Sequence, residues 1–103
     1  MNRRIILSPD AEADIASAIA WYQRIEPSWG LRFKADTRAT LRRIAQFPYQ
    51  FPLIEGTVRR ARLKRFRYAI LFSLEKEGAF VKAVVHERRD DGSWRNRGNG
   101  YSK

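Results

Sequence analysis

The chain has 103 residues, of which 44% are hydrophobic and 13% aromatic, which is enough apolar surface for one small folded domain. No apolar run approaches the roughly 20 residues that span a bilayer, and the N-terminus lacks the apolar stretch of a secretory signal. The absence of cysteine excludes disulfides and thiol chemistry, and a single His disfavours a protein-bound metal. We therefore expect a cytoplasmic domain that uses no metal or cofactor and has no membrane partner.

The excess of positive charge lies in the second half of the chain. Residues 1–56 contain 8 Lys or Arg and 6 Asp or Glu, whereas residues 57–103 contain 13 and 5. Most of these cations are Arg, whose planar guanidinium suits bidentate contact with phosphate or carboxylate. The net charge of +10 favours an anionic partner, either nucleic acid or an acidic protein, although a solvated basic face explains the charge equally well.

Two helices are predicted after a short β-prone run at residues 3–7. Ser8 and Pro9 are typical of the N-cap and first position of a helix, and apolar residues then follow at three- and four-residue steps for about 17 residues. The Glu26-Pro27-Ser28 break ends this helix, and we expect Ser28 to cap a second one. The spacing of three aromatic residues places them in the core or at the closure of this helical hairpin: Trp21, Tyr22 and Trp29.

The second half of the chain is predicted to form strands. Residues 47–56 contain two prolines and a glycine and are expected to be irregular, while residues 57–64, 68–74 and 80–87 alternate or are β-prone. The order β-α-α-β-β-β predicts an α+β domain over residues 1–97, with the helical hairpin on one face of a largely antiparallel, three-stranded sheet. Residues 98–103 form a short polar tail that is expected to be disordered.

The richest cluster of chemically useful side chains begins at His86, where the last predicted strand ends. Glu87, Arg88, Arg89 and Asp90 follow it directly, and Trp94 and Arg97 come soon after. Each has a structural alternative: His86 can bond to the backbone, Trp94 can cover the edge of the sheet, and Arg88 and Arg89 can pair with acidic neighbours. No nucleophilic triad, P-loop or dinucleotide fingerprint is present.

A metal-free ribonuclease is one function that this cluster can support. Such an enzyme needs a base for the 2′-hydroxyl, an acid for the leaving oxygen and cations for the charge that builds on the phosphate. His86 or Glu87 is a candidate base, Arg65 a candidate cation, and Tyr68 a residue that can orient or stack a nucleobase.

Three segments resemble one family. The opening SPDAEADIASAIAWY is similar to the first helix of the ParE/RelE superfamily of toxins from bacterial type II toxin–antitoxin systems. The segment RLKRFRYAILF resembles its central hairpin, and VVHERRDDGSWRNR resembles the closing signature of the ParE branch, also described as plasmid stabilisation proteins. Asp91 replaces the Pro that usually follows Asp90 in that signature. The resemblance covers about residues 3–97, and the family fold is β-α-α-β-β-β.

The resemblance implies two alternative activities. RelE-like members cleave mRNA on the ribosome with Lys, Arg and Tyr side chains, whereas ParE-like members are reported to poison DNA gyrase without being nucleases. The closing signature favours the ParE branch, and Tyr101 lies in a Gly-Asn-Gly-Tyr context unlike that of a catalytic C-terminal Tyr. We therefore expect a gyrase-directed toxin, with the RelE-like ribonuclease and a non-toxic nucleic-acid-binding module as alternatives.

The resemblance also implies a partner, and the positive charge concentrated where the last predicted strand ends predicts a contact surface. The partner is a cognate acidic antitoxin, a DNA-binding dimer whose disordered tail folds across the helical hairpin and the sheet. Target binding is expected at the basic edge of the sheet, through His86, Arg88, Arg89, Trp94, Arg97, Arg60 and Arg62. If the protein is a ribonuclease, the catalytic residues are expected to be His86, Arg65 and Tyr68.

Overall fold

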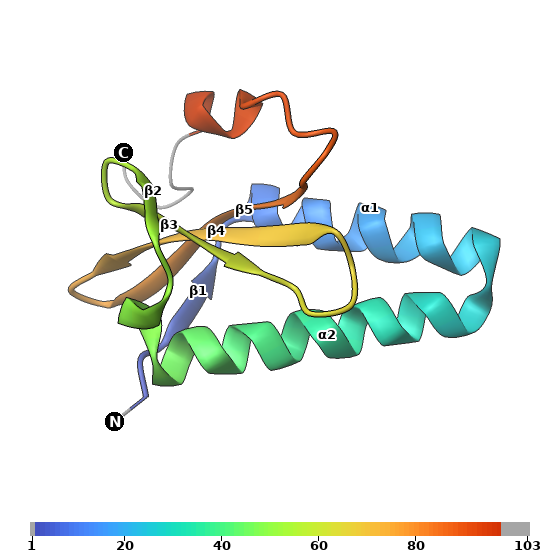
Figure 1. Cartoon of the computed structure of the whole chain (residues 1–103), viewed down its shortest axis with the longest axis horizontal. Helices are drawn as coiled ribbons and strands as arrows, with labels where there is room; N and C mark the ends of the chain where they lie inside the picture. The colour runs from blue at the N-terminus through green and yellow to red at the C-terminus, as the bar shows by residue number, and fades with distance from the viewer. Residues whose placement is uncertain (1, 98–103) are drawn as a thin grey trace.

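The computed structural model describes residues 2–97, which form two α-helices and one five-stranded sheet (Figure 1). The elements are β1 (Ile5–Leu7), α1 (Pro9–Ile25), α2 (Pro27–Gln46), the 3₁₀ turn η1 (Pro48–Gln50), β2 (Leu53–Glu55), β3 (Val58–Arg62), β4 (Tyr68–Glu75), β5 (Gly78–His86) and the 3₁₀ turn η2 (Ser93–Asn96). The α+β prediction is confirmed, and the predicted tail at residues 98–103, with Tyr101, lies outside the described residues. No helix within residues 2–97 is long and apolar enough to cross a membrane.

Helix α1 begins where the sequence predicts, because three features of its start agree. The Ser8 hydroxyl oxygen accepts a hydrogen bond from the backbone N–H of Ala11 at 3.0 Å. Pro9 occupies the first helical position, where its missing N–H costs nothing, and Asp10 and Glu12 lie near the positive end of the helix dipole. Local capping alone therefore determines this boundary.

The cap of helix α2 differs from the prediction that Ser28 caps it. Glu26 is the N-cap, and its carboxylate accepts the backbone N–H of Ser28 at 3.4 Å. Pro27 explains the difference, since its fixed φ and absent N–H suit the first helical position and move the cap before it. At Gly30 a Cβ atom would lie 3.1 Å from Gln23 Cβ, so glycine permits the close approach of the two helices.

The sheet has the strand order β1-β5-β4-β3-β2 and contains two more strands than the predicted three-stranded sheet. β1 pairs in parallel with β5, and the remaining neighbours are antiparallel. β2 lies inside the segment expected to be irregular. Its three residues are exposed and follow Pro52, so no alternation of polar and apolar residues indicates a strand there.

A β-bulge in the β4–β5 pair changes which residues of β5 face the helices. Leu71 pairs with Ala83 whereas Phe72 pairs with Val81, so Lys82 is the extra residue. Val81 and Val84 consequently pack in the same cluster on the helix side of the sheet, although strict alternation places them on opposite faces. The main core lies between this face and the helical hairpin, and its largest fully buried side chains are Phe33, Phe72, Ile44 and Ile70.

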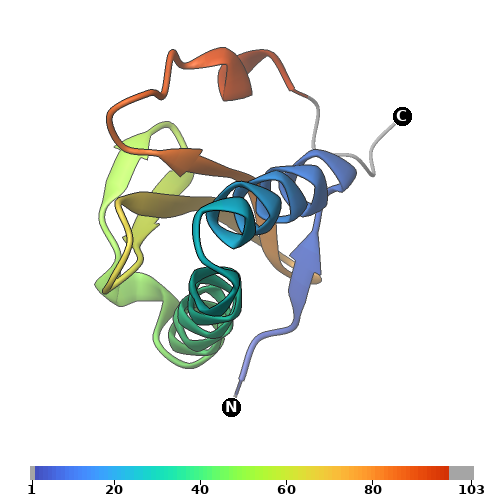
Figure 2. The same cartoon turned by 90° about the vertical axis from the view of Figure 1, so that its right-hand side faces the viewer.

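The C-terminal segment covers the other face of the sheet (Figure 2). Trp94 in η2 is only 3% exposed and packs against Leu71 and Ala83, with Val58 and Val85 around them. Trp94 was expected to be a target contact, and the structure gives it the alternative role of a cap over the sheet. The reason is that β4 and β5 present apolar side chains on both faces, so the outer face also needs cover.

The edge of β5 beyond the end of β1 is completed by side chains instead of a strand. Ser8 Oγ donates to the carbonyl of Lys82 at 3.3 Å, and the Asp14 carboxylate accepts the backbone N–H of Val84 at 2.9 Å. The Arg97 guanidinium binds both oxygens of Asp14, at 2.8 and 3.2 Å. Asp14 therefore joins helix α1, strand β5 and the C-terminal segment.

Replacing Trp94 with Ala should destabilise the protein by about 3 kcal/mol, because it leaves a cavity over the outer face of the sheet. Urea denaturation monitored by far-UV circular dichroism measures this loss. Arg95→Gln is the matched control in the same turn: it removes an exposed ion pair with Glu55 and a guanidinium that lies over the Trp94 ring, but it leaves the ring in place over the sheet, so it should cost only about 1 kcal/mol. Equal stabilities of the two variants would contradict the assignment of Trp94 as a structural cap.

Candidate interaction surface

His86, at the end of β5, organises the turn that follows it. Its Nδ1 atom accepts hydrogen bonds from the backbone N–H groups of Arg88 at 3.1 Å and Arg89 at 3.3 Å. Its ring lies edge-on to Tyr68, with the ring centroids 5.1 Å apart. Because Nδ1 accepts two hydrogen bonds, it carries no proton, and the backbone-bonded alternative for His86 is the one observed.

The surroundings of His86 favour its neutral form. Partial burial lowers the pKa of His86, and the neighbouring positive charge of Arg89 lowers it further. Arg67 and Arg88 act in the same direction, against the opposing effect of Glu87. Protonation at Nδ1 would remove the acceptor that holds the turn. The neighbouring positive charges disfavour this protonation and so help to preserve the two hydrogen bonds of the turn.

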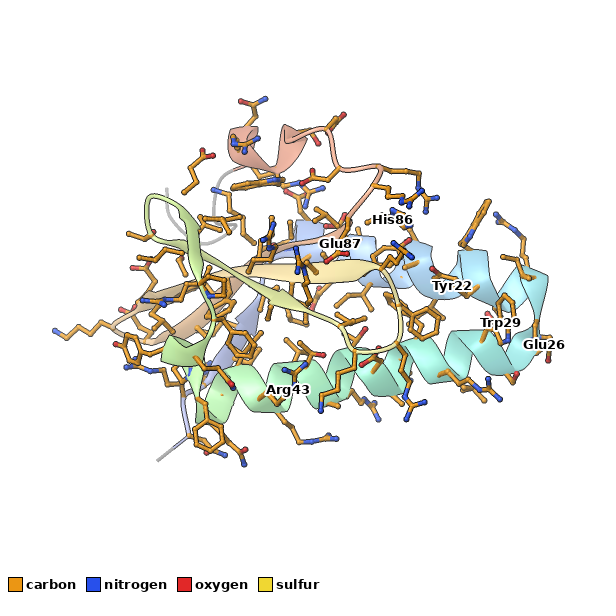
Figure 3. All side chains as sticks on the ribbon, viewed as in Figure 1. Tyr22, Glu26, Trp29, Arg43, His86 and Glu87 are labelled. Atoms are coloured by element: carbon orange, nitrogen blue, oxygen red, sulfur yellow. The ribbon has the colours of Figure 1, made fainter. Side chains whose placement is uncertain are left out.

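The other residues considered for ribonuclease chemistry are divided between separate places. The carboxylate of Glu87 forms an ion pair with Arg62 at 2.7 Å. Tyr68 is 7% exposed and its ring lies edge-on to that of His86, whereas Arg65 lines a groove together with Tyr22 and Trp29. In Figure 3, His86 and Glu87 lie close together, and Trp29 lies apart from them near the connection between the two helices. Within residues 2–97, no three side chains of the metal-binding types gather into a group that could hold an ion.

Arginines of the C-terminal half fall into paired and unpaired sets. Arg62, Arg95 and Arg97 form ion pairs with Glu87, Glu55 and Asp14. Within the described residues, Arg88 and Arg89 are exposed and form no ion pair. The carboxylates of Asp90 and Asp91 accept the backbone N–H groups of Gly92 and Ser93 instead.

The expected contact residues therefore have different positions. Arg88 and Arg89 are available to a partner, whereas Arg97 is held against Asp14 and Trp94 is buried. Arg60 and Arg62 line a separate hollow beside Phe51 and Pro52. The structure thus brings His86, Arg88 and Arg89 together, with Arg62 paired to Glu87 beside them, and places Trp94, Arg97 and Arg60 elsewhere.

Trp21 is an exposed residue beside this turn that the sequence prediction assigned to the core or the hairpin closure. Its side chain is 46% exposed, and the guanidinium carbons of Arg24 and Arg89 lie 5.6 and 5.9 Å from the centre of its ring. A cleft of about 410 Å³ separates it from β5, lined by Asp14, Ser17, Ala18, Trp21, Tyr68, Val84 and Arg89. Tyr22 packs against the core, and adjacent residues of a helix point about 100° apart. The position of Trp21 directly before Tyr22 is therefore the sequence signal from which its exposure could have been predicted.

A larger groove of about 910 Å³ lies between the helical hairpin and the loop that joins β3 to β4. Its apolar lining includes Tyr22, Phe66 and Trp29. Trp29, which was expected in the core or at the closure of the hairpin, lies in the first turn of α2 and is 40% exposed. Asp36 holds the loop, since its buried carboxylate accepts the backbone N–H groups of Lys64 at 3.2 Å and Arg65 at 2.7 Å. The groove is lined by Tyr22, Trp29, Arg32, Ala35, Asp36, Ala39, Lys64, Arg65 and Phe66.

We expect nuclear magnetic resonance to give a His86 pKa below its ordinary value of 6.5. His86 is the only histidine, so its ring signal can be assigned without ambiguity. The unfolded chain then takes up the proton at a higher pH than the folded chain, so the free energy of unfolding should fall as the pH drops through 6.5 toward the folded-state pKa.

Two variants control this titration. Arg89→Gln removes a neighbouring positive charge and should raise the pKa of His86 toward its ordinary value, whereas Lys76→Gln, in the turn between β4 and β5, should leave it unchanged. A pKa at or above 6.5 in the unmodified protein would show that the Nδ1 hydrogen bonds do not hold the turn in solution.

Comparison with known proteins relates the fold and the sequence to one family. A solved chain described as "Chromosomal ParDE TA system from P. aeruginosa" has a TM-score of 0.73 and 17% identity, covering 82% of this chain and 95% of that one; this likeness shows the fold. Among curated proteins, no sequence matches this chain. The family model for the ParE toxin of the type II toxin–antitoxin system, parDE, matches residues 5–91. The chain therefore belongs to the ParE toxin family of type II toxin–antitoxin systems.

Proposed function

We propose that this chain acts as a toxin that inhibits DNA gyrase by binding it, and that an acidic antitoxin neutralises it. Membership of the ParE family supports the role of toxin, and the resemblance of the closing segment to the ParE branch supports gyrase as the target. The expected location is the cytoplasm, where both gyrase and an antitoxin would be met.

His86 and Glu87, the two candidate bases, are both engaged in contacts within the protein, and this observation favours binding over catalysis. His86 Nδ1 accepts two backbone hydrogen bonds, and Glu87 pairs with Arg62 at 2.7 Å. A general base must be free to accept the proton that it removes. A ribonuclease that uses His86 or Glu87 as its base therefore has weaker support than an inhibitor that makes contacts through Arg88 and Arg89.

The groove beside the helical hairpin supports the antitoxin part of the proposal. Trp29 and Phe66 supply apolar surface, while Arg32, Lys64 and Arg65 supply positive charge at its rim. An acidic segment with apolar side chains is complementary to such a surface, and opposite charges speed the encounter of the two proteins. This groove and the exposed arginines of the turn after β5 are separate surfaces.

Two assays on the purified protein test the choice of target. Inhibition of gyrase-dependent DNA supercoiling is expected, together with intact mRNA on programmed ribosomes. Cleavage of ribosome-bound mRNA with unaffected supercoiling would replace the proposal with the ribonuclease alternative. Normal growth of cells that express the chain alone would instead favour the non-toxic nucleic-acid-binding module.

The double variant Arg88→Ala, Arg89→Ala should lose toxicity and retain its fold and its affinity for the antitoxin. The reason is that both side chains are exposed and unpaired, and exposed positions change stability by no more than about 0.5 kcal/mol. Growth on induction, thermal unfolding and antitoxin titration measure the three properties.

The double variant Arg38→Ala, Arg42→Ala is the matched control. It removes the same charge from exposed positions of α2 and should remain toxic. Full toxicity of a folded Arg88→Ala, Arg89→Ala protein would show that gyrase binds elsewhere, and equal loss in both double variants would show that only net charge matters.

A further inference from the structure

Trp21 lies at the centre of a basic surface made by α1, the β3–β4 loop and the turn after β5. We call this the arginine face and define it as Trp21, Arg24, Arg67, Arg88 and Arg89. All five side chains are exposed, and none of the four arginines forms an ion pair with a carboxylate of the described residues. The guanidinium carbons of Arg24 and Arg89 lie within 6 Å of the centre of the Trp21 ring. The backbone carbonyl of Arg67 accepts the N–H of Glu87, and the N–H groups of Arg88 and Arg89 bind His86 Nδ1, so this surface lies at the end of β5.

The composition of the arginine face differs from that of the apolar surface at the other end of the molecule. There Phe47, Tyr49, Leu53 and Ile54 are exposed together, as is typical of a surface that binds protein. Tyr49 also lies between two arginines, but Arg3 donates to its hydroxyl at 3.2 Å and Arg59 donates to the carbonyl of Phe51 at 2.7 Å. The arginine face instead combines one exposed aromatic ring with guanidinium groups that are not engaged in this way.

We propose that the arginine face binds single-stranded nucleic acid, with one base stacked on Trp21 and the flanking phosphates bound by the arginines. Nucleic-acid strands are held without sequence readout by this combination of an aromatic platform and a positive groove. The cleft of about 410 Å³ beside Trp21 has room for one base, and Ala18 and Val84 give it an apolar floor. This activity goes beyond the proposed action on gyrase, which requires only a protein target.

The turn after β5 arranges two of these arginines before any ligand arrives. The hydrogen bonds from the N–H groups of Arg88 and Arg89 to His86 Nδ1 fix the backbone from which both side chains extend. Their charges carry no internal carboxylate partner that a phosphate would need to displace. A pre-arranged site loses less conformational freedom on binding and so binds more tightly.

Fluorescence anisotropy with labelled 12-nucleotide oligothymidylate, 12-nucleotide oligouridylate and a mixed-sequence 12-base-pair DNA duplex tests the proposal. The full chain should bind the single strands more tightly than the duplex, because only an unpaired base can stack on Trp21. The two single-stranded probes distinguish a preference for DNA from one for RNA. Stronger binding of the duplex would overturn the proposal.

Trp21→Ala should weaken binding of the single strands about tenfold, within the range found for the loss of one stacked base, and Trp21→Phe should restore part of it. Arg89→Gln should also weaken binding and reduce the salt dependence, lowering the slope of log affinity against log salt by about 0.7. Far-UV circular dichroism and thermal unfolding of each variant establish that the loss is not one of folding.

Tyr49→Ala is the matched control, because it removes another exposed aromatic ring that also lies between two arginines. It should leave the affinity for every probe unchanged. Equal losses in Trp21→Ala and Tyr49→Ala, or no loss in folded Trp21→Ala, would overturn the stacking site. Because no gyrase is present in these measurements, their failure would leave the proposed inhibition of gyrase to its own assay.

Discussion

The hydrogen bonds that the Asp14 carboxylate accepts join helix α1, strand β5 and the C-terminal segment, and the arrangement of these three parts depends on them. Strand β1 ends beside Val81 and so does not reach Val84 of β5, whose backbone N–H is accepted by Asp14 at 2.9 Å. The same carboxylate binds the Arg97 guanidinium through both oxygens, and this hydrogen bonding raises the pKa of Arg97 further. One acidic side chain therefore completes the sheet edge, positions helix α1 and anchors the C-terminal segment.

That anchor explains why a segment with little regular structure can present a defined surface. Residues 87–97 leave β5 at the His86 turn, cover the outer face of the sheet through Trp94, and return to α1 through Arg97. Two kinds of arginine result. Arg97 and Arg95 hold the segment through ion pairs, whereas Arg88 and Arg89 lie between His86 and Trp94 and form no ion pair within the described residues.

Helix α1 contributes to both candidate surfaces through adjacent residues. Tyr22 lines the groove beside the β3–β4 loop, and Trp21 belongs to the arginine face. The rotation of about 100° between neighbouring helical positions separates the two surfaces without a change of element. The groove and the arginine face therefore begin at neighbouring residues of one helix.

Local signals in the sequence determined the helices, the central strands and the α+β class, because capping, proline positions and apolar spacing act over a few residues. Ser8 and Pro9 start α1 as predicted, and the strand predicted at residues 68–74 is observed as β4. The N-cap Glu26 was missed because Ser28 is the more common kind of cap, and Pro27 decided between them. Strand β2 was missed because exposed residues on an edge strand leave no pattern.

Only the tertiary structure decided the positions of the tryptophans and the state of His86. An aromatic ring is buried where residues distant in the sequence leave apolar surface uncovered. The bulge at Lys82 determines which residues of β5 present apolar side chains on each face of the sheet. Trp94 is buried because Leu71 and Ala83 lie beneath it, whereas Trp21 is exposed because its neighbour Tyr22 takes the place in the core. The sequence was sufficient to predict the basic edge of the sheet. Which of its arginines form ion pairs depends on the carboxylates that the fold brings near them.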